Sequence, residues 1–368
     1  SPPASHHESQ MKKLAVIIFF LLVVAGIVML SSAGVIEGQK KFDSSSYYLI
    51  HQILFGVLPG LLLFLIFSKI SYDKWRKFAL PLLLLALGLM VLVLAPSLGV
   101  VAKGAKRWLD LGLITVQPSE FLKFTLIIYL AAWFSQRSKG SVTVGDLIPF
   151  FLILGLVGIL LVLQPDFGTL GIVMLIASAM YFFSGAKLWH FGVLIAVVAL
   201  LLVVLSIAAP YRSDRIKAFL NPQEDKQGKA YNINQALISI GSGGVFGLGY
   251  GQSQQKFTYL PEPVGDSVFA VIVEEMGFVG GVALIVLFLI LLFSLMQIAK
   301  GSPDLFGRLF VLGFMVWIGG QAFINIAAIS GLIPLTGVPL PLISFGGSSL
   351  VSLMAGMGMV RNISHVDK

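Results

Sequence analysis

Four acidic side chains stand in one otherwise apolar stretch of the chain, "LPEPVGDSVFAVIVEEMG" at residues 260–277. Asp266 and Glu274 are eight residues apart, which on an α-helix is roughly 12 Å along the axis and about 80° around it. Asp266 directly precedes the apolar run, so it is either a helix N-cap or a residue at the mouth of a polar cavity that this helix lines with Glu274. The sequence pattern leaves both interpretations open.

A second candidate pair is Glu120 and Lys123 in "QPSEFLKF". Side chains three residues apart lie on one helix face, so the two are expected to form an ion pair. That pair is either a buried structural element or a cationic contact that its acid holds until a phosphate group arrives. Gln117 or Ser119, at the start of the same motif, can cap the helix, and Gln117 is assigned a supporting role.

Basic residues gather in "GAKRWLD". Arg107 can give bidentate hydrogen bonds to a diphosphate, and Lys106 can act beside it as a point charge. Trp108 is either an interfacial anchor of the kind common beside membranes or part of the same binding site. These three residues are therefore candidates for substrate binding.

Two further segments complete the candidate binding set. In "SFGGSSL", Ser344, Ser348 and Ser349 surround two glycines before a predicted helix, an arrangement that forms either an anion site or an ordinary helix start. Asp166 lies in the tight turn "LQPDFGT", which we place on the same side of the molecule.

The elements that carry these residues are predicted from composition. The chain has 368 residues, of which 57% are hydrophobic and 11% charged, against roughly 25% charged in soluble domains. Runs of about 20 apolar residues predict membrane-spanning helices. We expect an all-α polytopic membrane protein with ten transmembrane helices, at 14–33, 47–68, 78–98, 118–135, 147–164, 168–184, 189–209, 266–299, 309–330 and 346–361.

Domain organisation and orientation follow from the same runs. We expect one membrane domain over residues 11–368, preceded by a short added leader at 1–10. The basic residues of the short loops are more numerous on the side of the two termini, which predicts that both termini are cytoplasmic. The long loop at 210–265, between helices 7 and 8, is then extracellular, and the candidate residues face outward. Glu274 and Glu275 lie inside the membrane, so at least one must turn inward and find a partner.

Several classes of site are excluded. The chain has no cysteine, so disulfides, thiolate nucleophiles and cysteine metal sites are absent. The segment "GSGGVFGLGYG" lacks the G-x-G-x-x-G spacing of dinucleotide-binding loops, and the histidines are too scattered for a metal cluster. The formal charge of +8 fits either an anionic lipid or diphosphate ligand or basic cytoplasmic loops, and we expect no nucleic-acid partner.

Taken together, the motifs resemble the signature of the SEDS family (shape, elongation, division and sporulation). The motifs cover residues 100 to 361 in the family's order and are "GAKRWLDLG", "QPSEFLKF", "LQPDFGT", "YRSDRIKAFLNP", "QALISIGSGGVFGLGYG", "YLPEPVGDSVFAVIVEEMG" and "PLPLISFGGSS". The resemblance implies a ten-helix enzyme that polymerises lipid II into glycan strands at the outer face of the bacterial cytoplasmic membrane. It further implies a class B penicillin-binding protein and other membrane proteins of the elongation machinery as partners.

The resemblance also implies roles for single residues. Asp266 matches the acid of the family's large-loop motif, and Trp108 matches the indispensable tryptophan of the earlier loop. Many members read Thr-Asp-Phe where this chain has Gly265, Asp266 and Ser267. We favour the elongation branch, which is RodA-like, with the FtsW-like division branch as the alternative.

The implied reaction is an inverting glycosyl transfer from an undecaprenyl-diphosphate donor. It needs a base near the attacking hydroxyl, for which Asp266 is the candidate, and cations near the leaving group, for which Arg107 and Lys123 are candidates with Lys106. A divalent cation, Mg²⁺ or Mn²⁺, is left open, and no other cofactor is assigned. Glu274 and Glu275 are expected to shape or balance the cavity. A lipid II flippase is the rival function, but its site should lie near the bilayer midplane rather than at one face.

Overall fold

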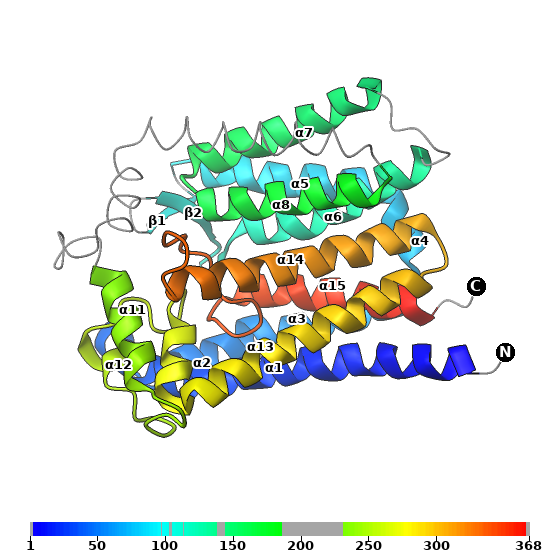
Figure 1. Cartoon of the computed structure of the whole chain (residues 1–368). Helices are drawn as coiled ribbons and strands as arrows, with labels where there is room; N and C mark the ends of the chain where they lie inside the picture. Colours follow the sequence, from blue (N-terminus) through cyan, green and yellow to red (C-terminus); the bar gives the residue numbers. More distant parts are fainter. Residues whose placement is uncertain are drawn as a thin grey trace.

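The computed structural model describes residues 3–96, 98–102, 105–112, 114–137, 144–185 and 231–365. Long helices run side by side in a bundle, and both termini lie at the same end of it (Figure 1). The strands and the short helices α11 and α12 lie at the opposite end, which we call the loop end. The predicted helical architecture is confirmed.

The helices have the following bounds. Up to residue 185 they are α1 (Pro3–Phe42), α2 (Tyr47–Gln52), the π-helix η1 (Ile53–Val57), α3 (Leu58–Lys69), α4 (Tyr72–Lys77), α5 (Ala79–Val93), α6 (Pro118–Arg137), α7 (Val144–Leu163) and α8 (Phe167–Phe183). From residue 231 they are α11 (Tyr231–Ser242), α12 (Gln255–Thr258), α13 (Val268–Gly301), α14 (Leu305–Ile329) and α15 (Gly347–His365).

Four segments of the described chain are long and apolar enough to cross a membrane: Gln10–Phe42, Tyr47–Lys69, Val268–Gly301 and Leu305–Ile329. Ala79–Val93, Ile148–Leu163 and Phe167–Phe183 are shorter apolar helices. Nine of the ten predicted spans coincide with described helices, and the remaining one, 189–209, lies outside the described residues. The count of ten therefore stays a prediction.

The predicted loop at 210–265 is described only from residue 231. That part is more ordered than the sequence suggested, because it contains the helices α11 and α12. The buried positions of α11 recur every third residue, at Ile233, Ala236 and Ser239, so they form one face that turns toward the protein. Packing of this face holds α11 against α13.

The expectation of a purely helical chain needs one correction, in the loop that carries the basic cluster. A small antiparallel sheet is present there, with strand order β1 (Gly99–Ala102), β2 (Ala105–Asp110), β3 (Thr115–Val116). β-Branched Val100 and Val101 favour the extended backbone. In the β1–β2 register Trp108 faces Val100 and Lys106 faces Val101, which leaves Arg107 as the extra residue of a bulge. A bulge re-aims the side chain of the extra residue.

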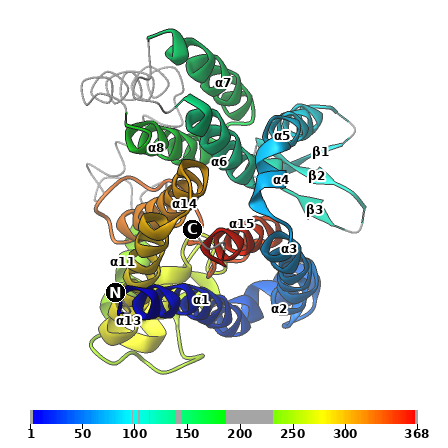
Figure 2. The ribbon, with the colours of Figure 1, turned by 90° about the vertical axis from the view of Figure 1, so that its right-hand side faces the viewer.

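Glycines permit the closest helix packing, between α3 and α15. A Cβ at Gly60 would lie 2.4 Å from Met354 Sδ, and one at Gly358 would lie 2.4 Å from Phe64 O. Small residues that let backbones approach are typical of helix contacts in membranes. Seen along the bundle, α15 lies centrally, between α1, α3, α6 and α14 (Figure 2). The start of α15, with its serines, is therefore positioned by several helices at once.

Candidate active site

Asp266 lies in a turn directly before α13. The N-cap position of α13 belongs to Ser267, whose side chain makes no capping hydrogen bond. The turn runs one residue further than the sequence suggested, because Gly265 N and Ser267 N both donate to Glu262 O. Asp266 is therefore half-buried and lies one residue before the N-cap position of α13, and its functional role stays a prediction.

The backbone of Asp266 is fixed from α14. Asn325 Nδ2 donates to Asp266 O at 2.8 Å and to Val338 O at 2.7 Å, so one buried amide joins the Asp266 turn to the segment before α15. A Cβ placed on Gly337 would lie 3.8 Å from Asp266 Oδ2, so the carboxylate faces that segment. A side chain on a backbone that is held in this way is well positioned for chemistry.

Ser344 fixes the same turn from the other side. Its hydroxyl donates to Gly265 O at 2.7 Å and accepts from Leu340 N at 2.8 Å. Beside it, Phe345 N donates to Val264 O at 2.8 Å. Ser344 was predicted to bind substrate, whereas in this structure its hydroxyl bonds support the Asp266 turn.

Glu120 and Lys123 form the expected pair near the start of α6. Lys123 Nζ lies 2.8 Å from Glu120 Oε1 and 3.0 Å from Gln321 Oε1, and 5.0 Å from the centre of the Trp317 ring. Lys123 is 2% exposed and Glu120 3% exposed. The other carboxylate oxygen, Glu120 Oε2, is buried without a hydrogen-bond partner, so Glu120 depends on Lys123 for its charge balance.

Gln321 and Asn325 link this pair to Asp266. They lie one helical turn apart on α14, and Gln321 Nε2 donates to Pro339 O at 3.0 Å, next to the residue that Asn325 binds. Neither amide was predicted to belong to the site. Two polar amides four residues apart in the apolar run "WIGGQAFIN" nevertheless indicate a buried polar contact on this helix. The polar contacts around Lys123 and Asp266 are therefore continuous through α14.

The bulge of β2 turns Arg107 toward the turn before α8. Arg107 Nε donates to Gln164 O at 3.2 Å, and its Nη2 donates to Pro165 O. Because these partners are neutral carbonyls, the positive charge is not cancelled by them and remains able to attract an anion. Lys106 and Trp108 are half-buried on the same strand.

Two of the three other predicted residues have structural contacts, and the third is half-buried. Asp166 is the buried N-cap of α8, accepting from Thr169 N at 3.2 Å and Thr169 Oγ1 at 2.8 Å. Ser348 Oγ accepts from Gln117 N at 3.0 Å and so ties the start of α6 to α15. Ser349 is half-buried in the first turn of α15. These contacts are structural, and the proposed substrate contacts of the three side chains stay predictions.

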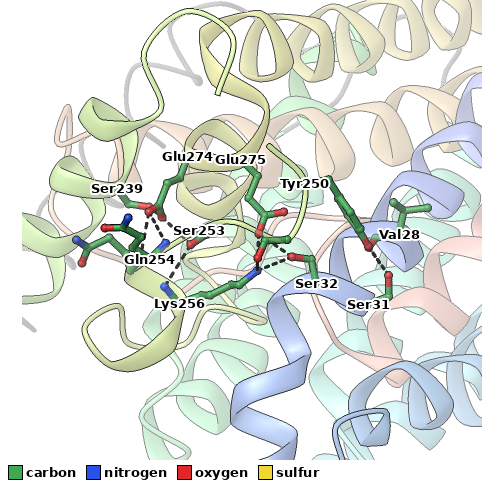
Figure 3. A network of polar contacts seen from close by, with 12 residues as sticks. Val28, Ser31, Ser32, Ser239, Tyr250, Ser253, Gln254, Lys256, Glu274 and Glu275 are labelled. Atoms are coloured by element: carbon green, nitrogen blue, oxygen red, sulfur yellow. Dashed lines mark hydrogen bonds and ion pairs between the residues drawn. The ribbon is translucent and has the colours of Figure 1, made fainter. Parts of the chain in front are cut away.

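Glu274 holds the segment before α12 against α13 (Figure 3). Its Oε2 accepts from Ser239 Oγ and Ser253 Oγ, each at 2.6 Å, and its Oε1 accepts from Gln254 N at 2.8 Å and Gln255 N at 3.2 Å. Four donors on one carboxylate compensate for its complete burial. Glu274 therefore has a structural role, because it binds the segment before α12, and it lies eight residues after Asp266 in the chain.

Glu275 forms a buried ion pair beside Glu274 (Figure 3). Lys256 Nζ lies 2.6 Å from Glu275 Oε1, which also accepts from Ser32 Oγ of α1 at 2.6 Å. The sequence predicted that at least one of the two acids turns inward and has a partner, and in the structure both acids turn inward. Lys256 was missed, although it ends a stretch, 231–255, that contains no charged residue.

No group of three or more His, Asp or Glu side chains that could hold a metal ion is found among the described residues. What the described side chains can do by themselves is accept a proton at Asp266 and attract an anion at Lys106 and Arg107.

Lys123→Ala is expected to lower both thermal stability and activity, because it leaves Glu120 as an unpaired buried acid, at a cost of roughly 3–5 kcal/mol. The double variant Lys123→Ala/Glu120→Gln removes that charge, and we expect it to regain most of the wild-type melting temperature but not the activity. Thermal melting and activity are measured on the same preparations. Recovery of activity together with folding would contradict a substrate contact and reduce the pair to a structural role.

The comparisons with known proteins cover nearly the whole chain. The profile of the family described as "Cell cycle protein", which groups FtsW, RodA and SpoVE, matches residues 12–368. Stage V sporulation protein E of Bacillus subtilis is 38% identical over 337 residues, which is 91% of this chain and 92% of that protein. A protein of Coxiella burnetii named as a probable peptidoglycan glycosyltransferase, FtsW, is 38% identical over 339 residues, 90% of each chain.

Two solved structures are similar in fold. A chain from a structure of a peptidoglycan synthase complex that coordinates polymerization and crosslinking has a TM-score of 0.80 and 30% identity, covering 95% of this chain and 96% of that chain. The rod shape determining protein RodA of Thermus thermophilus has a TM-score of 0.71 and 29% identity, covering 96% of this chain and 97% of that chain.

Proposed function

Because the chain belongs to the family of cell cycle proteins that groups FtsW, RodA and SpoVE, which is the SEDS family, we propose that this multi-pass membrane protein is a peptidoglycan glycosyltransferase. Its substrate in this proposal is lipid II, which it polymerises into glycan strands. The observation that carries the proposal is the position of Asp266, outside the cap of α13 and on a turn whose carbonyls are bound by Asn325 and Ser344. The relatives that are named as glycosyltransferases support it.

Asp266 acts in this proposal as the general base. It takes the proton from the acceptor sugar's hydroxyl while that oxygen attacks the anomeric carbon of the donor and the lipid diphosphate leaves from the opposite face. The fixed backbone around Asp266 keeps the carboxylate in place without cost at the moment of reaction. Asp266 is half-buried, so part of the residue remains accessible.

Cations balance the leaving diphosphate. Arg107 and Lys106 on β2 are the candidates at the loop end, and Lys123 is a third that would have to exchange Glu120 for the phosphate. A divalent cation, Mg²⁺ or Mn²⁺, is treated as a condition of the assay, and no step is assigned to it. For orientation we propose that both termini are cytoplasmic, so that the loop end faces outward from the cytoplasmic membrane.

The biological branch has two candidates. Likeness to RodA supports the elongation role that the motifs first suggested. Identity of 38% to proteins named FtsW and stage V sporulation protein E supports the division or sporulation role, which is the second candidate. Expression of this chain in bacteria depleted of one or the other polymerase tests the assignment, since only the matching strain should regain its shape or its septa.

The proposed partner is a class B penicillin-binding protein. Support comes from the similar chain in the peptidoglycan synthase complex, whose two activities are polymerization and crosslinking. A polymerase that hands its strand to a crosslinking enzyme needs that enzyme on the same face of the membrane. Other membrane proteins of the elongation machinery belong to the elongation candidate only.

Purified protein in detergent is expected to convert labelled lipid II into glycan ladders, with the partner and Mg²⁺ or Mn²⁺ each present or omitted. Detergent removes the two compartments, so transport has no meaning there while polymerisation remains possible. Ladders are resolved by gel electrophoresis. If no condition gives polymer while reconstituted vesicles move lipid II across the bilayer, the flippase is the correct function.

A further inference from the structure

The glycine-rich segment at 243–251, "GGVFGLGYG", packs against a break in α13. Gly277 interrupts that helix with φ 71° and ψ −172°, so neighbouring backbone groups lose their helical partners. The segment supplies replacements through four hydrogen bonds: Leu248 N to Glu274 O at 2.9 Å, Gly249 N to Glu275 O at 2.9 Å, Phe278 N to Gly244 O at 2.9 Å and Val279 N to Val245 O at 3.1 Å.

The glycines are what make this close approach possible. A Cβ at Gly247 would lie 2.2 Å from Glu275 O, and one at Gly243 would lie 2.0 Å from Val273 O. Gly247 has φ 81° as well, which favours glycine on its own. The segment therefore keeps an irregular backbone that is bonded to α13 rather than to water.

The side chains of the segment are apolar and exposed. Phe246 is 83% exposed and Val245 is 58% exposed, and Leu248 is also exposed. The exposed face continues onto α13 at Phe278 and Val279, which the segment touches. It then runs along the membrane-crossing part of α13 through Val282, Val286, Leu289 and Phe293.

A second helix fixes the depth of the segment independently. The Tyr250 hydroxyl lies 2.8 Å from Val28 O and 2.6 Å from Ser31 Oγ, both in α1 (Figure 3). Val28 is within the uncharged run of α1, nine residues before Glu37, which is about 13 Å along the helix. Both α1 and α13 thus hold the segment beside their apolar, membrane-crossing parts.

We propose that residues 243–251 are inserted into the membrane leaflet at the loop end, where Val245, Phe246 and Leu248 contact lipid acyl chains. Irregular backbone is tolerated at such depth only where its polar groups are satisfied by protein, and the bonds to α13 satisfy the amides of Leu248 and Gly249 and the carbonyls of Gly244 and Val245 in this way. The absence of charge from 231 to 255 removes the usual obstacle to insertion. Lipid is favoured over a partner helix as the occupant because the exposed face is continuous with the length of α13.

The same arrangement gives a structural role to the buried acids Glu274 and Glu275. Glu274 and Glu275 lie directly before the break in α13 and bind the chain on both sides of the segment, at Ser239 before it and at Ser253 and Lys256 after it. They keep the two ends of the insertion attached to α13 and α1. The segment is therefore inserted while protein contacts hold the chain on both sides of it. It precedes the turn that carries Asp266 in the sequence.

The absence of cysteine makes the depth of Phe246 measurable. Phe246→Cys is spin-labelled in the full-length protein, reconstituted in phosphatidylglycerol and phosphatidylethanolamine vesicles, and its collision rates with oxygen and with a water-soluble nickel chelate are compared. Val286→Cys, on the exposed face of α13, is the lipid reference, and Asp43→Cys, in the exposed turn after α1, is the aqueous reference. We expect the oxygen-to-nickel ratio of Phe246→Cys to lie on the lipid side of the midpoint between the references.

Two results would overturn the insertion. One is a ratio for Phe246→Cys that matches Asp43→Cys, which would place the segment in water. The other is a lipid-like ratio that appears only after a partner protein is added, which would make the exposed face a protein interface. Melting temperatures of the three labelled proteins are compared first, and Val245→Cys repeats the measurement if Phe246→Cys is unfolded.

Discussion

Asp266→Asn is expected to abolish glycan polymerisation while leaving thermal melting unchanged. Asn keeps the size of Asp but cannot accept a proton as a carboxylate does, so the loss should reach roughly 10²–10⁴-fold in rate. The contacts that hold this turn use the backbone carbonyls of Gly265 and Asp266, which the substitution does not alter. Initial rates of ladder formation from labelled lipid II, on matched preparations, give the measurement.

The control for this substitution is Asp43→Asn. Asp43 is an exposed acid in the turn after α1, where it accepts from Gln39 Nε2 at 2.7 Å, and its neutralisation should leave the rate unchanged. Equal rates for Asp266→Asn and the wild type would show that the base is another group. Equal losses in both variants would point to a general effect of surface charge.

The sequence predicts the helices well because their signal is local. Runs such as 14–33 and 309–330 are apolar over a membrane's thickness, and no tertiary contact is needed to recognise them. The spacing of Glu120 and Lys123 is also a local property of one helix, so the pair was predictable.

Contacts between distant segments were not predictable in the same way. Lys256 and Glu275 are 19 residues apart across a turn, and Ser32 reaches them from the first helix. The apolar sequence around Glu275 predicts that a buried acid has a partner, but it does not predict which residue that partner is. Asn325 is a similar case, because an amide in an apolar helix shows that something is bound but not that it is the carbonyl of Asp266.

The exact start of α13 is a different case. An Asp directly before an apolar run is a good N-cap by residue type, but the turn at 262–267 closes on Glu262 O and shifts the cap to Ser267. The bulge at Arg107 is likewise a matter of strand register, which single residues of "GAKRWLD" do not specify.

Lys256→Met should destabilise the protein by roughly 3–5 kcal/mol, because it leaves Glu275 charged, buried and without its cation. Met keeps much of the length and apolar volume of the lysine stem, so the effect isolates the charge. Glu275 Oε2 already has no hydrogen-bond partner, and Lys256 is the cation paired with Oε1, so Ser32 alone would remain at the carboxylate. The midpoint of thermal unfolding in detergent gives the measurement.

The matched control is Lys41→Met, which removes a cation from the Lys41–Glu37 pair of α1. Lys41 is 54% exposed as a side chain, so this pair is worth only about 0–1 kcal/mol. The double variant Lys256→Met/Glu275→Gln should recover most of the lost stability, because no buried charge remains. If Lys256→Met has the same melting temperature as Lys41→Met, the Lys256–Glu275 pair does not hold the segment at 243–251 and the residues up to Lys256 against α1 and α13. The four hydrogen bonds on Glu274 would then have to hold this part of the chain without the ion pair.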